Sequence, residues 1–384
     1  MRCSKPKERI MADTKVVLKA CHAYDRDTVT EAVDAIFAQF GGITAVVKPG
    51  QRVLVKVNLL MKRKPEQATT THPEVAYAIV RAVQRAGAIA ILADSPGGPY
   101  TKGMLEGIYN TCGMTSVASE TGCLLNEDFS ITTHYYEQGK VARKLDLIGI
   151  LDHVDAVITV GKLKTHGFTT MTGCVKNLYG LVPGTTKVEY HSRYPSASLF
   201  SDMILDICEH VKPCFAFVDG IVGMEGEGPS GGKPRTIGAL IGCRNLHAVD
   251  AVAASLIGLR AEQVATLAAA KRRSLLPEYE VMGDNIEQLI LRDFDIPMKM
   301  RKGSWVALMN KLPQPLRPRP VFTHKQCNGC AVCMRSCPVG AISMDKKQRP
   351  NVDVQKCIRC FCCQELCPKN DIIVRRNPLF NLLK

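Results

Sequence analysis

Long apolar runs are missing from this sequence of 384 residues. No run approaches the roughly 20 residues that a helix needs to cross a bilayer, so we expect no transmembrane segment. The first thirty residues also lack a charged start followed by an apolar stretch, which argues against a secretory signal. The 17 cysteines could form disulfides in a small secreted protein, but the chain is large, and a cytoplasmic location is expected. Met11 is an alternative start that the sequence leaves open.

Acidic residues are scarce relative to basic ones, and the formal net charge is +14. Such an excess of positive charge favours the binding of polyanions only where the basic residues cluster. The basic residues are spread along the chain, except that six of them fall between residues 297 and 320 with no acid and no interleaved aromatic pattern. We therefore expect no nucleic-acid partner. Salt-sensitive binding of nucleic acid through this basic segment is the weaker alternative.

Four prolines fall in the eight positions from 313 to 320, which favours an extended backbone. This stretch predicts a domain boundary. Just before it, residues 298–312 could form a basic amphipathic helix, as either a connecting helix or a membrane-surface contact. The expected organisation is an α/β domain over 1–296, a basic proline-rich linker over 297–320 and a small α+β domain over 321–384.

Short apolar runs alternate with helical patterns in the first domain. "VLVKVN" and "AIAILADS" flank a helix that begins near Pro73, which suits a first helical turn. Strands that alternate with helices predict an α/β fold with a largely parallel or mixed sheet flanked by helices. Further strands are expected at 155–161, 214–222 and 236–243, helices around 199–211 and 248–259, and additional antiparallel strands within the ambiguous stretch 112–150.

The most specific signal is a duplicated cysteine motif near the carboxyl end. "CNGCAVCMRSCP" begins at Cys327, and the same cysteine spacing recurs from Cys357. Three cysteines two residues apart wrap a loop around an iron-sulfur cube, and the cysteine before each proline binds the other cube. Structural zinc is the alternative, and it fits two Cys-Pro steps poorly. We predict two [4Fe-4S] clusters, one bound by Cys327, Cys330, Cys333 and Cys367, the other by Cys337, Cys357, Cys360 and Cys363.

Residues 321–384 resemble a bacterial-type ferredoxin domain with two [4Fe-4S] clusters. Two positions depart from that pattern: Phe361 stands where a small residue is commoner, and Cys362 is a ninth cysteine, interpreted as a spare buried thiol. The domain contains eleven Lys and Arg against four Asp and Glu, so we expect an acidic electron carrier of flavodoxin or ferredoxin type as a partner. The clusters could relay electrons or could only hold the small domain together.

Polar side chains follow the carboxyl ends of two expected strands. Lys56 and Asn58 end the first, and Lys162, Lys164 and His166 share one face after the second, because side chains alternate along a strand. Ligands of open α/β sheets gather at this edge. The pattern predicts a cationic pocket for a carboxylate or phosphate, with solvated surface lysines as the alternative. The candidate substrate-binding residues are Lys56, Asn58, Lys162, Lys164, Lys176 and Asn177, and the candidate proton donors are His166, His191 and Cys174.

The glycine-rich stretch "VDGIVGMEGEGPSGG" matches neither the P-loop nor the dinucleotide-binding pattern. Its acidic residues, Asp219, Glu225 and Glu227, could bind a divalent cation, or could border the pocket and balance its lysines. His72 and Asp250 are interpreted as helix-capping residues.

Seven stretches, in order, resemble the family named domain of unknown function 362: "KVNLL", "TTTHP", "ADSPGG", "KLKTH", "CVKNLYGLVPG", "VDGIVGMEGEGP" and "AVDAVAASLIG". Members of that family often carry a ferredoxin domain at the carboxyl end. The resemblance therefore implies the domain arrangement, a family domain followed by a ferredoxin domain, but it implies no established reaction.

Two functions from different classes remain. The leading hypothesis is a cytoplasmic iron-sulfur oxidoreductase that passes electrons from the ferredoxin domain to a small anionic substrate, with a histidine near its ordinary pKa of about 6.5 as proton donor. The rival hypothesis is a non-catalytic electron carrier or adaptor whose lysines dock a partner protein.

Overall fold

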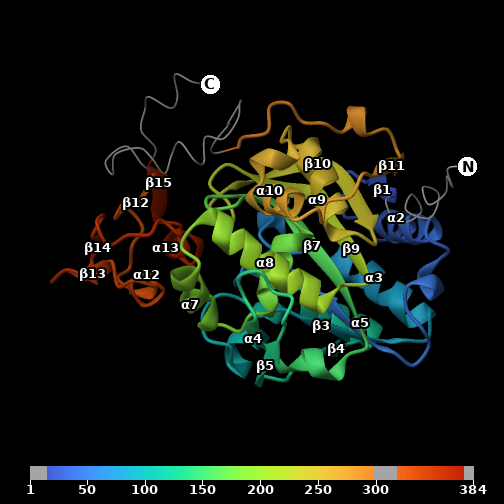
Figure 1. The fold of residues 1–384 in the computed structure, drawn as a ribbon, viewed down its shortest axis with the longest axis horizontal. Helices are drawn as coiled ribbons and strands as arrows, with labels where there is room; N and C mark the ends of the chain where they lie inside the picture. Colours follow the sequence, from blue (N-terminus) through green and yellow to red (C-terminus); the bar gives the residue numbers. More distant parts are fainter. Residues whose placement is uncertain (1–14, 297–317, 376–384) are drawn as a thin grey trace, which may run out of the picture.

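The computed structural model describes residues 15–296 and 318–375 (Figure 1). Within these ranges, nine strands form one mixed sheet in the order β11-β1-β10-β9-β7-β2-β3-β4, with β8 paired to β7. The expected mixed sheet is confirmed. The strands are β1 (Lys15–Ala20), β2 (Arg52–Lys56), β3 (Ile89–Ala93), β4 (Leu124–Leu125), β7 (Ala156–His166), β8 (Thr170–Thr172), β9 (Phe215–Glu225), β10 (Lys233–Cys243) and β11 (Glu280–Gly283).

The predicted βαβ unit is present and lies toward the β4 end of the sheet. Strands β2 and β3 are parallel and are joined through helix α3 (Pro73–Arg85). His72 caps this helix, because its Nδ1 accepts a hydrogen bond of 3.2 Å from the backbone N–H of Glu74. Strand β7 continues the parallel arrangement beside β2, and β9 follows beside β7. The carboxyl ends of four strands therefore meet at one edge.

Helices cover both faces of the sheet, because apolar side chains point to both faces, as strand β2 shows. Leu54 packs into one core and Val53 and Val55 into the other, as alternation along a strand requires. The first core is covered by α8 (Ala197–Val211), α9 (Leu246–Leu256) and α10 (Ala265–Arg272), and the second by α2 (Arg26–Ala38), α3, α4 (Lys102–Thr111) and α5 (Met114–Thr121).

The small domain lies beside the large one, next to α7 (Thr186–Arg193) in Figure 1. Each predicted cysteine loop leads into a short helix, and two antiparallel strand pairs enclose the two loops. Strand β12 begins at Arg319, and the predicted helix over 298–312 lies outside the described residues. The elements are β12 (Arg319–Phe322), α12 (Val332–Arg335), β13 (Ile342–Met344), β14 (Pro350–Val352), α13 (Cys362–Glu365) and β15 (Ile372–Arg375).

The ambiguous stretch 112–150 forms a helix as well as strands. Besides α5 and the short β4, it contains an antiparallel pair, β5 (Ile131–Tyr135) and β6 (Lys144–Ile148). The expected antiparallel strands are thus confirmed, whereas helix α5 was not predicted. Across the described ranges, no helix combines the length and apolar character needed to span a bilayer.

Candidate functional site

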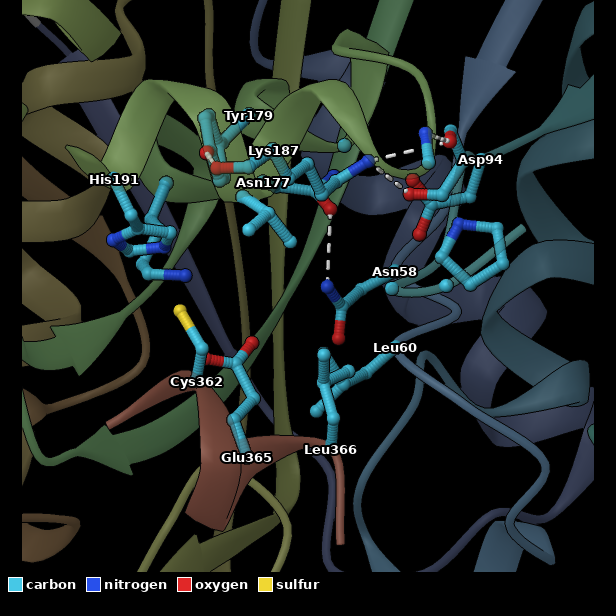
Figure 2. A pocket seen from close by; sticks show the side chains of 18 residues that line it. Asn58, Leu60, Asp94, Asn177, Tyr179, Lys187, His191, Cys362, Glu365 and Leu366 are labelled. Atoms are coloured by element: carbon cyan, nitrogen blue, oxygen red, sulfur yellow. Dashed lines mark hydrogen bonds between the residues drawn. The ribbon is translucent and has the colours of Figure 1, made fainter. Parts of the chain in front are cut away.

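A cleft of about 610 Å³ lies between the large domain and helix α13 of the small domain (Figure 2). The carboxyl ends of β2 and β3, helix α6 (Cys174–Asn177) and helix α7 border it. It is lined by Asn58, Leu60, Asp94, Ser95, Pro96, Gly97, Gly98, Lys176, Asn177, Tyr179, Gly180, Gly184, Lys187, Val188 and His191 of the large domain and by Cys362, Glu365 and Leu366 of the small domain.

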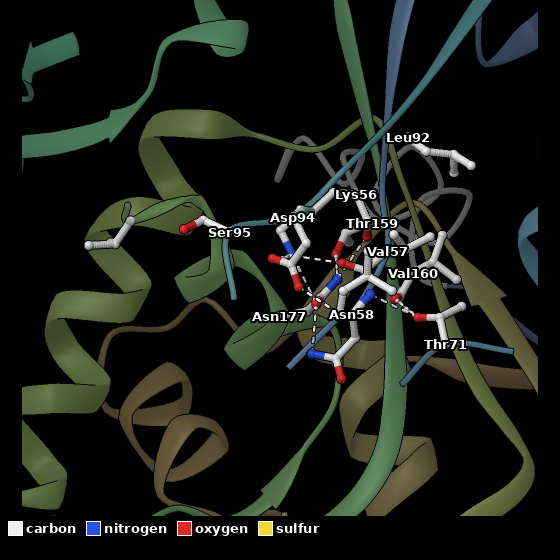
Figure 3. A network of polar contacts seen from close by, with 12 residues as sticks. Lys56, Val57, Asn58, Thr71, Leu92, Asp94, Ser95, Thr159, Val160 and Asn177 are labelled. Atoms are coloured by element: carbon white, nitrogen blue, oxygen red, sulfur yellow. Dashed lines mark hydrogen bonds and ion pairs between the residues drawn. The ribbon is translucent and has the colours of Figure 1, made fainter. Parts of the chain in front are cut away.

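A buried polar network supports the floor of the cleft (Figure 3). The Nζ of Lys56 lies 2.7 Å from the Oδ1 of Asp94 and donates to the Oδ1 of Asn177 at 3.1 Å. The amide nitrogen of Asn177 donates in turn to the carbonyl of Lys56 at 2.9 Å. Burial lowers the pKa of Lys56, and the charge of Asp94 opposes that effect. Lys56 therefore positions Asn177 and Asp94 without lining the cleft itself.

Lys164 holds Asn58 in one orientation. Its Nζ donates to the Oδ1 of Asn58 at 2.8 Å and to the carbonyl of Thr69 at 2.6 Å. The Nδ2 of Asn58 must then face the cleft and Asn177, whose Oδ1 lies 3.3 Å away. Burial lowers the pKa of Lys164 to about 7, so its charge responds to any anion bound nearby.

Lys162 lies in a separate buried network. Its Nζ lies 2.9 Å from the Oδ2 of Asp219 and 2.6 Å from the hydroxyl of Tyr24. Asp219 also accepts from that hydroxyl and from the backbone N–H of His72. The predicted pocket residues therefore separate into two groups, and Lys162 does not line the cleft.

The structure gives no support to a divalent cation at the three acids of the glycine-rich stretch. Asp219 is paired with Lys162, and Glu225 accepts from the backbone N–H of Asp295 at 3.1 Å. Within the described ranges, one group of three His, Cys, Asp or Glu ligand atoms lies within 4.8 Å of one another, and the three acids are not part of it. That group consists of His324, Cys327 and Asp371.

The two lysines nearest the open space differ in their partners. The ammonium of Lys187 donates to the carbonyl of Ser95 at 2.7 Å, to the Ser95 hydroxyl at 3.2 Å and to the carbonyl of Val182. Burial lowers the pKa of Lys187 to about 7. Lys176 is half-buried, has no hydrogen bond or ion pair with any described residue, and lies 5.8 Å from the centre of the Tyr179 ring. Lys176 is therefore the cation available to a ligand.

His166 faces the small domain rather than the cleft interior. Its Nδ1 accepts from the backbone N–H of Phe168 at 3.0 Å, which leaves the proton on Nε2. That nitrogen lies 3.5 Å from the Oε2 of Glu365. Burial lowers the pKa of His166 to about 4. Burial would raise the pKa of Glu365, but Lys176 and His166 bring it well below its ordinary value, so a neutral imidazole faces a carboxylate.

The other two candidate proton donors differ in their access to the cleft. His191 lines it, stacks on Phe200 at 4.3 Å and has a pKa lowered to about 3 by burial. Cys174 is fully buried outside the cleft lining, where its thiol donates to the carbonyl of Phe217 at 3.0 Å. Asp250, inside α9, caps the start of α6 by accepting from the backbone N–H of Cys174 at 2.6 Å. Neither histidine is charged at neutral pH, contrary to the basis of the sequence hypothesis.

Helix α13 is fixed to the large domain by several contacts. Gln364 donates to the carbonyl of Glu227 at 2.9 Å, and Ser230 donates to the carbonyl of Glu365 at 2.9 Å. The ring of Phe361 packs against Gly167, where a Cβ would lie 3.5 Å from it. The bulky residue at 361 thus forms a docking contact between the two domains.

The eight cysteines of the duplicated motif line two cavities. One cavity, of about 350 Å³, is lined by Cys327, Cys330, Cys333 and Cys367. The other, of about 320 Å³, is lined by Cys337, Cys357, Cys360 and Cys363. The cysteine before each proline crosses to the opposite cavity, as the spacing predicted.

The backbone of the two cysteine loops repeats as well. Gly329 and Ala331 have φ values of 70° and 56°, and the equivalent Arg359 and Phe361 have 59° and 61°. This left-handed backbone is uncommon for a bulky residue such as Phe361. Both loops therefore curve in the same way around their cavities, which is the arrangement that lets backbone N–H groups approach a bound cluster.

Several residues of the cleft were not predicted. Asp94 and Ser95 follow strand β3 as Asn58 follows β2, so the same strand-end rule could have identified them. Lys187 lies one turn before His191 on α7, so the four-residue spacing in the sequence could have placed both side chains on the same face of a helix. Glu365 and Cys362 gave no such signal, because nothing in the sequence says where the small domain docks.

Two family models match the chain. The model described as domain of unknown function (DUF362) matches residues 53–255, and the model described as 4Fe-4S dicluster domain matches residues 319–368. The tail is thus a 4Fe-4S ferredoxin-type domain.

The chain is similar to two curated proteins. It is 32% identical over 332 residues to the thylakoid-associated protein sll1697 of Synechocystis, covering 81% of this chain and 98% of that protein. It is 35% identical over 75 residues to pyruvate synthase subunit PorD of Methanocaldococcus jannaschii, covering 20% of this chain and 76% of that protein.

Two solved structures show a limited likeness. The lactate racemase apoprotein of Thermoanaerobacterium thermosaccharolyticum has a TM-score of 0.40 at 14% identity, covering 64% of this chain and 57% of that one. A Thermotoga maritima protein has a TM-score of 0.39 at 13% identity, covering 67% and 61%. The chain therefore spans about three fifths of each solved structure.

Proposed function

Because the chain belongs to the family described as domain of unknown function (DUF362) and carries a 4Fe-4S ferredoxin-type domain behind it, we propose that it is an iron-sulfur oxidoreductase acting on a small anionic substrate. In this proposal the two cysteine-lined cavities hold two [4Fe-4S] clusters, which supply one-electron transfer. The similarity of the tail to a pyruvate synthase subunit supports an electron-transfer role. We call the site lined by Cys327, Cys330, Cys333 and Cys367 the outer site, and the site lined by Cys337, Cys357, Cys360 and Cys363 the inner site.

The observation that carries the proposal is the position of α13. This helix contains Cys363 of the inner site and also places Cys362 and Glu365 in the cleft. Phe361 lines the inner cavity and packs on Gly167 of the large domain. A ligand in the cleft would therefore border the cluster-binding loop, which suits direct electron transfer between them.

The charges around the cleft support an anionic substrate. Lys176 forms no hydrogen bond or ion pair with a described residue, although its charge helps to lower the pKa of the nearby Glu365 carboxylate. Lys164 and Lys187 are each hydrogen-bonded to neutral acceptors. Of the acids that line the cleft, Asp94 pairs with Lys56 and Glu365 faces His166. In a partly dehydrated site, such cations stabilise negative charge as it develops on a reduced carbonyl or ring.

We assign distinct roles to the cleft residues. Lys176 and the Nδ2 of Asn58 bind the anionic group, and Asn177 holds Asn58 in place. His191, a neutral imidazole whose Nδ1 has no hydrogen-bond partner among the described residues, is the candidate hydrogen-bonding group for the reacting end. Lys56 and Lys164 act as positioning residues, and Lys162 stabilises the fold.

The test begins with anaerobic cluster reconstitution, which should give about eight iron atoms and eight sulfides per chain. The reduced protein is then mixed with a panel of small carboxylates and small organic phosphate esters, while cluster reoxidation is followed optically. We expect one class of acid to accelerate reoxidation. Lys176→Met should weaken that effect by roughly tenfold, because a charged hydrogen bond contributes about 1.5–3 kcal/mol, whereas the exposed Lys48→Met should not.

Two outcomes would redirect this proposal. A colourless preparation without labile sulfide would remove the electron source altogether. If no acid accelerates reoxidation but a redox protein does, and Lys176→Met weakens that complex, the rival role of carrier or adaptor is favoured instead.

The cellular location stays a proposal. We expect the cytoplasm, and the thylakoid association in the name of the Synechocystis relative supplies the alternative of a membrane-bound pool. Cell fractionation with a low-salt and a high-salt wash separates the two.

A further inference from the structure

The outer and inner cysteine sites differ in their access to solvent. Of the eight cysteines in the motif, Cys330 of the outer site is the one that is exposed. Met334, at the next turn, is 37% exposed. On the inner side, Phe361, Cys360 and Cys363 are buried against the large domain and the small-domain core. The outer site is therefore open to solvent at Cys330, whereas the buried side of the inner site lies toward the large domain.

Cations surround the exposed outer site. Arg335 donates to the carbonyl of Cys330 at 2.9 Å, and Lys369 lines the outer cavity. The turn between β13 and β14 packs on the same loop, since a Cβ on Gly329 would lie 2.9 Å from that of Gln348. This contact places the turn, which carries the exposed Lys346 and Lys347, against the loop of the outer site.

Acidic groups do not neutralise these cations. Asp345 accepts from the backbone N–H groups of Lys347 and Arg349 at 2.8 and 2.7 Å, so it organises the turn. None of Arg335, Lys346, Lys347 and Lys369 has an ion pair with a described residue. We define the outer face as Cys330, Met334, Arg335, Lys346, Lys347 and Lys369.

We propose that the outer face is the docking surface through which an acidic electron-carrier protein delivers electrons one at a time. The proposal rests on the proposed function and adds the direction of flow: electrons enter at the outer site and leave through the inner site into the cleft. In each encounter the partner is oxidised by one electron and the outer site is reduced by one electron. Met334 supplies an apolar centre and the cations supply a rim, the usual composition of a transient interface.

The test uses flavodoxin in its hydroquinone form as the acidic carrier and follows bleaching of the reconstituted, oxidised protein by anaerobic stopped flow. The second-order rate constant should fall as ionic strength rises, because salt screens complementary charges. Lys346→Glu/Lys347→Glu should lower the rate constant by roughly tenfold at low ionic strength, since electrostatic steering is worth that order of magnitude.

The matched control is Lys48→Glu/Lys212→Glu. It changes the net charge equally, and both lysines are exposed just before strands β2 and β9, at the edge of the sheet opposite the cleft. Its rate constant should stay within about twofold of the parent, because its charges lie beyond screening distance of the outer face. Equal slowing of the two double variants, or a rate constant insensitive to salt, would overturn the proposed docking surface.

Dithionite separates this inference from the proposed function. As a small chemical reductant in excess, it should bleach the parent and both double variants to the same final extent, which shows that the clusters are intact. If the preparations lack labile sulfide and dithionite bleaches none of them, the proposed function fails. If it bleaches all of them and flavodoxin does not distinguish the outer face from the control, the docking surface alone fails.

Discussion

At the scale of single residues, Lys162 and Asp219 form an ion pair, and its loss should lower the free energy of unfolding measurably. Both side chains are almost completely buried, and the carboxylate would keep only neutral donors without the lysine. Lys162→Met should therefore lower the free energy of unfolding by about 3–5 kcal/mol. Urea unfolding measures this, with the exposed Lys233→Met as a control that should stay within about 0.5 kcal/mol of the parent. Equal midpoints for the two variants would refute the structural role assigned to Lys162.

A second residue-scale prediction concerns the pH dependence of anion binding. Burial lowers the pKa values of Lys164 and Lys187 to about 7, so each ammonium loses its proton as pH rises through neutrality. A bound anion favours the protonated form, so affinity should fall between pH 6 and pH 8 and binding should take up protons. Calorimetry with the acid found by the reoxidation screen, in two buffers of different ionisation enthalpy, measures the uptake. Identical heats in both buffers would contradict this prediction.

The sequence predicted the cations of the site better than their partners. Strand-end position identified Lys56 and Asn58, and the structure places both in or under the cleft. Lys162 satisfies the same pattern but belongs to another network, because Tyr24 and Asp219 reach it from remote parts of the chain. Period-two alternation determines which face a side chain takes, and only the tertiary fold determines what it meets there.

At the scale of elements, the docking of α13 depends on a glycine. A Cβ on Gly97 would lie 2.2 Å from the Cδ2 of Leu366, so a larger side chain must displace that leucine. Gly97→Val should therefore weaken the docking and slow ligand-induced reoxidation severalfold, because small misplacements of reacting groups reduce rates strongly. Stopped-flow reoxidation with the acid from the screen measures it.

The control for this prediction is a second substitution that compensates for the first. Gly97→Val combined with Leu366→Ala removes the clash and should recover most of the rate, while Leu366→Ala alone should have a smaller effect than Gly97→Val. A double variant as slow as Gly97→Val would show that the glycine acts through its own loop and not through α13.

Element boundaries show where local patterns stop being informative. The expected strand 155–161 continues to His166 as β7, because pairing with β8 and β9 extends the strand beyond its apolar run and buries the polar residues that follow. The short β11 has no buried residue, so its pairing with β1 left no hydrophobic pattern to detect. The grouping of the eight cysteines around two cavities agrees with their spacing, since metal-ligand spacing is a local property, and the bound clusters themselves stay a prediction.

At the scale of the whole molecule, the domain arrangement places the two halves of the tail in different surroundings. The duplicated loops are nearly equivalent in sequence and backbone, yet one is exposed under a basic rim and the other borders the cleft. An internal duplication alone could not predict this asymmetry, because it arises from the docking of α13 on the large domain. Function should therefore distinguish two loops that the sequence makes alike.

Equivalent substitutions in the two loops test that asymmetry. Cys327 and Cys357 are both half-buried and lie outside the small hydrophobic core, so Cys→Ser at either position should spare the fold. Each variant should retain about four of eight iron atoms. Cys327→Ser should lose fast reduction by flavodoxin but, once reduced by dithionite, still pass electrons to a ligand in the cleft. Cys357→Ser should be reduced normally by flavodoxin and fail to be reoxidised by that ligand. Stopped-flow measurements of reduction by flavodoxin and of reoxidation by the ligand test both expectations. If instead Cys357→Ser loses fast reduction and Cys327→Ser loses reoxidation, electrons run from the cleft outward or the assignment of outer and inner sites is reversed.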